Sequence, residues 1–129
     1  MLVLAMSLIL SLNVSGIYLP KSGNGISPHY KFIHSLMADL TISTTGKATC
    51  TANAKTEPNY TVEIVCELRN SNGATLKSWS DSNTWYASAG GSWYVKSGSQ
   101  YQVVATATIY DADGNYVDSG TTYSRNVSY

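Results

Sequence analysis

The side chains that could carry out catalysis are few and scattered in this 129-residue chain. Its histidines, His29 and His34, lie near the N-terminus, and neither has a serine or cysteine nearby in a recognised nucleophile motif. The carboxylates lie in separate turns or on outward strand positions, whereas a glycosidase needs two at a fixed separation across a cleft. Glu63 and Glu67 share one face of a predicted strand, as is common on solvated faces. We therefore expect no catalytic residue, no cofactor and no enzymatic activity.

An acidic segment, Asp111-Ala112-Asp113-Gly114-Asn115, has the oxygen side chains that begin a calcium loop. However, its glycine comes too early for such a loop, and Thr122 stands where the bidentate glutamate should be. A hairpin turn with positive φ at Gly114 explains the same residues. The cysteines also lack a second cysteine pair or a histidine at ligand spacing. We therefore expect a turn here and no metal site in the chain.

The two cysteines, Cys50 and Cys66, each lie within an alternating apolar and polar run, on the apolar parity. That parity lets them meet inside the core. An even pair of cysteines in a small exported chain predicts a disulfide. Such a bond would stabilise the fold by about 3 kcal/mol on the chain-entropy estimate. The alternative is a pair of buried free thiols.

Aromatic side chains are the clearest sign of a binding function. The chain has ten tyrosines and three tryptophans but one phenylalanine, and the tyrosine hydroxyl favours a partly wet position. Trp93 and Tyr101 have core parity and are expected to be structural. Exposed rings amid Ser, Asn and Asp suit the faces of sugars or a protein surface, although cross-strand pairing on an exposed face is the alternative. The candidate ligand-binding residues, on outward positions or loops, are Trp85, Tyr86, Tyr110 and Tyr116, and Tyr94 also lies outward.

The elements that position these residues are predicted to be β-strands. From Leu36 onward, apolar and polar residues alternate with a period of two, which is typical of half-buried strands. Residues 81–91 are expected to be partly loop, and the last strand to run to Tyr129. About seven antiparallel strands with polar turns predict an all-β immunoglobulin-like or fibronectin III-like two-sheet sandwich, with a closed barrel as the rival. The expected strands include 36–43, 47–54, 62–69, 74–80 and 101–110.

The first sixteen residues read as a leader for export. They hold an apolar run that is too short to span a bilayer and that suits a signal peptide, which is removed from the mature protein. No Lys or Arg precedes the run. We therefore expect residues 1–16 to be a signal peptide, either complete or lacking its true start, and the alternative is a buried N-terminal helix. Residues 17–34 are then a connection, and residues 35–129 the domain. We expect a secreted or cell-surface protein that does not span the membrane.

The charged residues narrow the class of partner. They make up 12% of the chain, about half the globular average, and the formal net charge is zero. The basic residues are spread singly along the sequence and form no run that would neutralise phosphates, so we expect no nucleic-acid partner.

One local pattern resembles a known fold family. The run Val95-Lys96-Ser97-Gly98-Ser99-Gln100-Tyr101 is similar to the corner between the fifth and sixth strands of fibronectin type III domains. In that tyrosine corner, the hydroxyl bonds back to the backbone a few residues upstream. The resemblance implies the same bond from Tyr101. The tryptophan that this family carries on its second strand is absent, and Cys50 occupies that region.

A second resemblance covers residues 26 to 129. It rests on Ile26 to Tyr30, on Leu40 to Ser43, on Gly46 to Cys50 and on Lys77 to Ser80. These segments resemble small secreted proteins of Gram-positive Firmicutes that form a family with a domain of unknown function. The resemblance implies an exported bacterial β-sandwich and implies no activity.

Taken together, these patterns predict a non-enzymatic extracellular binding module. Its expected ligand is a carbohydrate or a protein, and we expect it to be a monomer. The alternative is a structural or spacer domain outside the cell. A binding module should gather Trp85, Tyr86 and their neighbours into one exposed patch, whereas a spacer should not.

Overall fold

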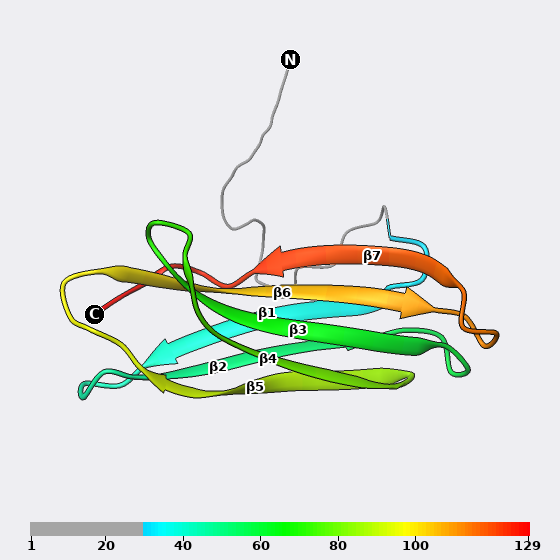
Figure 1. The fold of residues 1–129 in the computed structure, drawn as a ribbon, viewed down its shortest axis with the longest axis horizontal. Helices are drawn as coiled ribbons and strands as arrows, with labels where there is room; N and C mark the ends of the chain where they lie inside the picture. Colours follow the sequence, from blue (N-terminus) through cyan, green and yellow to red (C-terminus); the bar gives the residue numbers. More distant parts are fainter. Residues whose placement is uncertain (1–29) are drawn as a thin grey trace, which may run out of the picture.

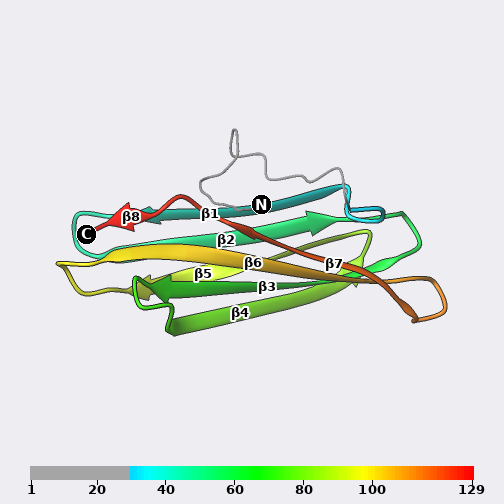
Figure 2. The same cartoon turned by 90° about the horizontal axis from the view of Figure 1, so that it is seen from above.

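The computed structural model describes residues 30–129, and these form two antiparallel β-sheets packed face to face (Figures 1 and 2). The predicted signal peptide, 1–16, and the predicted connection up to residue 29 lie outside the described residues. The expected all-β sandwich is confirmed. Its strands are β1 (Ser35–Ile42), β2 (Lys47–Lys55), β3 (Thr61–Asn70), β4 (Thr75–Thr84), β5 (Tyr86–Tyr94), β6 (Gln100–Tyr110), β7 (Tyr116–Tyr123) and β8 (Val127–Ser128).

The strand order is that of an immunoglobulin-like sandwich. One sheet has the order β1-β2-β5, and the other has the order β4-β3-β6-β7, with β8 also paired to β6. In immunoglobulin constant domains the fourth strand belongs to the sheet of the first two. Here β4 instead pairs with β3 in the five-stranded sheet. The strands β4 and β5 are therefore the edges of different sheets along the same side of the sandwich.

The period of two in the sequence explains the core. Inward residues of β2, β3 and β6 are buried, while their neighbours in sequence are mostly half-buried or exposed. Large aliphatic side chains and several alanines share this core, which lets the facing sheets interlock. Its largest fully buried apolar members are Leu36, Leu40, Ile64, Leu68, Ile109, Val62 and Val103.

Two expected features of the strands are wrong. Residues 81–91 are almost entirely strand, because β4 runs to Thr84, β5 begins at Tyr86 and Trp85 alone joins them. The last segment is not one strand, since β7 ends at Tyr123 and the short β8 pairs with the far end of β6. The sandwich has eight strands, of which the last, β8, has two residues, in agreement with the expected number of about seven.

The expected disulfide is also not formed. Cys50 in β2 and Cys66 in β3 both face the core, as their parity predicts, but both are free thiols. Inward parity sets the face on which a side chain lies, and it does not by itself bring two sulfur atoms into the geometry of a disulfide. Free thiols also remove the support that the cysteine pair gave to export.

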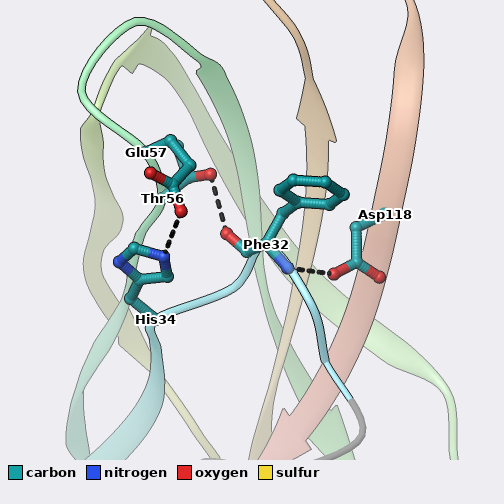
Figure 3. Close-up of polar contacts among 5 residues, drawn as sticks. All are labelled: Phe32, His34, Thr56, Glu57 and Asp118. Atoms are coloured by element: carbon teal, nitrogen blue, oxygen red, sulfur yellow. Dashed lines mark hydrogen bonds and ion pairs between the residues drawn. The ribbon is translucent and has the colours of Figure 1, made fainter.

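Before β1, residues 30–34 close the open side of the sandwich between β1 and β7 (Figure 3). The Phe32 N–H donates to Asp118 Oδ2 in β7 over 2.9 Å, and the Phe32 carbonyl accepts from the buried Thr56 hydroxyl over 2.8 Å. His34 Nε2 lies 2.8 Å from Glu57 Oε2 at the surface. This segment therefore ties the β2–β3 connection to β7. Within residues 30–129, no helix is long and apolar enough to cross a membrane.

Candidate binding groove

The connections of the sandwich divide it into two ends. We call the end with the β1–β2, β3–β4 and β5–β6 connections the β5–β6 end, and the opposite end, with the β2–β3, β4–β5 and β6–β7 connections, the β6–β7 end (Figure 1). At the β5–β6 end, a groove of about 490 Å³ lies between the β3–β4 hairpin and the chain that leaves β5. This volume is typical of small-ligand sites. The groove is lined by Asn70, Leu76, Trp93, Tyr94, Val95, Lys96, Ser97, Ser99 and Tyr101.

Trp93 lines this groove because β5 is an edge strand. It pairs with the buried Ala48 and so has inward parity, as the sequence predicts. However, β5 is at the edge of its sheet, and no strand in the described part of the chain covers the inward face of Trp93 on the side between β4 and β5. The Trp93 side chain is therefore 42% exposed. The expected core position of Trp93 is therefore wrong, whereas the expected core position of Tyr101 is confirmed by its 4% exposure. Tyr94, which follows Trp93 in β5, is 67% exposed.

The segment that leaves β5 is held firmly by backbone contacts. The Val95 N–H donates to the Gly46 carbonyl over 2.9 Å, and the Tyr101 hydroxyl donates to the Lys96 carbonyl over 2.5 Å. Farther along, the Tyr129 N–H donates to the Ser99 carbonyl over 3.0 Å. One wall of the groove is therefore ordered before any ligand arrives, which reduces the entropy lost on binding.

A second hollow, of about 500 Å³, lies beside the groove. The two share Ser99, whose hydroxyl lies 3.3 Å from the Ser71 hydroxyl across the β3–β4 hairpin. Polar side chains line most of this hollow. Aromatic rings in one depression and hydroxyl groups in the next therefore lie along one end of the molecule. The second hollow is lined by Ser71, Gly98, Ser99, Gln100, Ser128 and Tyr129.

Two of the candidate residues, Trp85 and Tyr86, lie together at the β6–β7 end. Trp85 is 46% exposed, and its φ of 74° is rare for a bulky residue. Its N–H donates to the Tyr60 carbonyl and its carbonyl accepts from the Thr56 N–H, both over 2.8 Å. The Lys55 ammonium lies 4.7 Å from the centroid of its ring. Tyr86 pairs with Lys55 on the outer face of the three-stranded sheet.

The other two, Tyr110 and Tyr116, lie on the five-stranded sheet. They are register partners in β6 and β7, and the Tyr110 hydroxyl donates to Glu63 Oε1 over 3.4 Å. The negative charge of Glu63 raises the pKa of Tyr110. Because Tyr86 and Tyr110 face outward from different sheets, the four candidates form two separate pairs rather than one patch.

The acidic segment before β7 is a turn, as expected. Asp111 Oδ1 accepts from the N–H groups of Asp113 and Asn115, both over 2.9 Å, and Gly114 has a φ of 85°. These backbone N–H donors lower the pKa of Asp111. Between residues 30 and 129, no group of three or more His, Cys, Asp or Glu side chains could hold a metal ion.

Sequence reasoning missed the groove because its walls come from different sheets. Periodicity shows that Trp93 lies on an inward position, but it does not show that β4 and β5 are edges. The signal that could have revealed the groove is the adjacent Trp93-Tyr94 pair, followed at once by a glycine-containing turn at Gly98. No protein-family model matches the chain, and no curated protein matches it significantly.

Proposed function

We propose that this protein is a non-enzymatic extracellular binding module that takes a carbohydrate in the groove at the β5–β6 end. The observation that carries the proposal is the position of Trp93 and Tyr94, which are partly exposed beside hydroxyl and amide side chains. The flat faces of aromatic rings suit the C–H faces of sugar rings. Asn70, Ser97 and Ser99 supply hydrogen-bonding groups for sugar hydroxyls.

Three further features support an exported, fibronectin III-like module. The apolar leader in the sequence suits export, and the strand order suits the immunoglobulin-like sandwiches of cell-surface domains. The bond from the Tyr101 hydroxyl to the Lys96 carbonyl is the bond expected of a tyrosine corner. We propose on these grounds that the protein acts outside the cell. We also propose that it is a monomer, and that it is related to the small secreted Firmicute proteins that its sequence segments resemble.

The second candidate function is a structural or spacer domain, with any protein ligand bound elsewhere. It is favoured by the separation of the four candidate aromatics into two pairs on different sheets. In that case, the exposed rings would serve cross-strand packing, for which the register partners Tyr110 and Tyr116 are placed.

A screen of glycans and cell-wall polysaccharides, read by intrinsic tryptophan fluorescence, tests the proposal. We expect a saturable signal that Trp93→Ala abolishes and Trp85→Ala preserves. The two tryptophans make a matched pair, because they are 42% and 46% exposed at opposite ends. Loss of binding in Trp85→Ala alone would move the site to the other end. No binding to any glycan would favour the spacer.

A further inference from the structure

The zero net charge of the chain conceals a separation of charge between the ends of the sandwich. At the β5–β6 end, the described residues include one acidic side chain, Glu67. Its carboxylate is paired with Arg69 over 2.5 Å. Asp39 and Asp81 lie in mid-strand, opposite Thr51 and Ile64. The basic residues that begin, end or follow strands at the β5–β6 end are Lys47, Arg69, Lys77, Lys96 and Arg125.

The opposite end has the reverse balance. There, Glu57 lies in the β2–β3 connection, and Asp111 and Asp113 lie in the β6–β7 turn. Lys31 and Lys55 are the described lysines near them, and each is placed over an aromatic ring, Phe32 and Trp85 respectively. Positive potential is therefore concentrated at the groove end and negative potential at the other end.

Two lysines flank the aromatic part of the groove, and a third is the strand partner of Tyr94. Lys96 lines the groove directly. The Lys77 ammonium lies 5.1 Å from the centroid of the Trp93 ring, which keeps a positive charge next to the exposed indole. Lys47 is the register partner of Tyr94 and shares its outward face. Lys47 and Lys96 are exposed and Lys77 is half-buried, so a ligand could pair with their ammonium groups without burying an unpaired charge.

From this arrangement we infer that the ligand of the groove is an anionic polysaccharide, in which negatively charged groups alternate with sugar rings. The inference rests on the proposed function and names its ligand class. The rings of Trp93 and Tyr94 contact the sugars, and Lys77 and Lys96 pair with carboxylate, sulfate or phosphate groups. All these charges lie close to the groove on the scale of the Debye length, which is about 8 Å at physiological ionic strength.

Binding of paired charged and neutral polymers tests the inference. The first pair is polygalacturonate and its fully methyl-esterified form, which differ in carboxylate charge. The second is dextran sulfate and dextran, which differ in sulfate esters, so the two pairs separate the two sources of negative charge. Affinity is measured by calorimetry and by tryptophan fluorescence on the full chain. We expect one or both charged polymers to bind more tightly than their neutral partners, by about tenfold if two exposed lysines contribute.

Lysine variants identify the site. Lys77→Gln and Lys96→Gln should each weaken binding of the charged polymer by up to about fivefold, the upper end of the range for an exposed ion pair. They should leave the melting temperature unchanged, because the Lys96 carbonyl, and not its side chain, accepts the Tyr101 bond. Lys55→Gln is the matched control, since Lys55 also lies over a tryptophan, Trp85, but at the other end. Raising the salt from about 20 mM to about 500 mM should weaken wild-type binding.

The outcomes separate this inference from the proposed function. Equal affinity for the charged and neutral forms, lost in Trp93→Ala, would overturn the inference and leave the carbohydrate site standing. Binding of the charged forms that Lys55→Gln weakens more than Lys77→Gln would also overturn it. Binding of neither form of either pair would contradict both the inference and the proposed function.

Discussion

The indole of Trp79 lies directly on Gly91, and this contact joins the edge strands of the two sheets. A Cβ atom on Gly91 would lie 2.5 Å from Trp79 Nε1, which is closer than atoms can pack. Gly91 pairs with Cys50 in one sheet, and Trp79 pairs with Cys66 in the other. The glycine and the tryptophan therefore form one layer of the core with the two cysteines. This layer lies on the side of the sandwich where β4 and β5 are not paired by strand hydrogen bonds.

This contact predicts that Gly91→Ala destabilises the fold. The new methyl group must displace the indole, and overpacking of this kind costs about 1–3 kcal/mol. Urea unfolding of the variant measures the loss. The same substitution in a Trp79→Ala background should cost much less, because the ring is no longer there. If Gly91→Ala costs the same in both backgrounds, then the cause is the backbone of β5 and not the indole.

Gly120→Ala provides a comparison. A Cβ atom there would lie 2.5 Å from the ring of Tyr30, at the same distance as in the first case. Tyr30 comes from the segment before β1 rather than from a strand, so its ring can move away more easily. We expect Gly120→Ala to destabilise the protein less than Gly91→Ala does.

The two buried thiols predict an unreactive native state. Burial raises the pKa of Cys50 to about 11, and burial together with the nearby Cys50 raises the pKa of Cys66 to about 12. The thiolate is the reactive form, so at pH 8 neither cysteine should react with an aromatic disulfide reagent until denaturant is added. Alkylation of the denatured, unreduced protein, followed by mass measurement, should then show two modified cysteines. A mass without adducts would mean that a disulfide had formed.

The same pKa shifts predict a loss of stability at alkaline pH. The folded state holds the thiol protons more tightly than the unfolded state does, so this contribution is fully present below about pH 9 and is lost as the pH rises toward 12. Because lysines and tyrosines also titrate in this window, the comparison is between the wild type and Cys66→Ala. The variant should be less stable at neutral pH and should lose less stability between pH 9 and 11. Parallel pH curves for the two proteins would contradict the prediction.

The sequence predicted the regular part of the fold and not its edges. Alternation located β1, β2, β3 and β6, because each has a clear buried face. It failed between residues 81 and 91, where the end of β4 is polar on both faces and the inward face of β5 carries alanine and glycine rather than large apolar side chains. The inward parity of Cys50 was correct, but parity does not show whether its sulfur atom meets that of Cys66 in the geometry of a disulfide. The groove and the separation of charge depend on which ends of strands lie together, and this is a property of the topology.

The left-handed backbone of Trp85 predicts an unusual order of stability among its variants. Two backbone hydrogen bonds fix residue 85 at a φ of 74°, where a Cβ atom costs about 1–2 kcal/mol and glycine has no such cost. Trp85→Gly should therefore be more stable than Trp85→Ala, by up to about 1 kcal/mol in urea unfolding.

Tyr94 is the control for this order. It is an exposed aromatic residue of β5 with ordinary strand geometry, so glycine should be the worse substitution there. If the Trp85→Ala variant proved at least as stable as Trp85→Gly, then backbone strain at residue 85 would not contribute significantly to the free energy of unfolding.

The bond from Tyr101 to Lys96 links the stability of the fold to the shape of the groove. The Tyr101 side chain is 4% exposed, and its hydroxyl supports the carbonyl of a residue that lines the groove. Tyr101→Phe keeps the ring but removes this donor, which should cost about 1 kcal/mol in urea unfolding. Since the wall between Val95 and Lys96 becomes less ordered, binding in the groove should also weaken.

Tyr110→Phe is the matched control, because the Tyr110 hydroxyl contacts Glu63 over 3.4 Å on an exposed face. This variant should change neither the stability nor the binding. Weaker binding in both variants to the same extent would show that the Tyr101 hydroxyl does not order the groove.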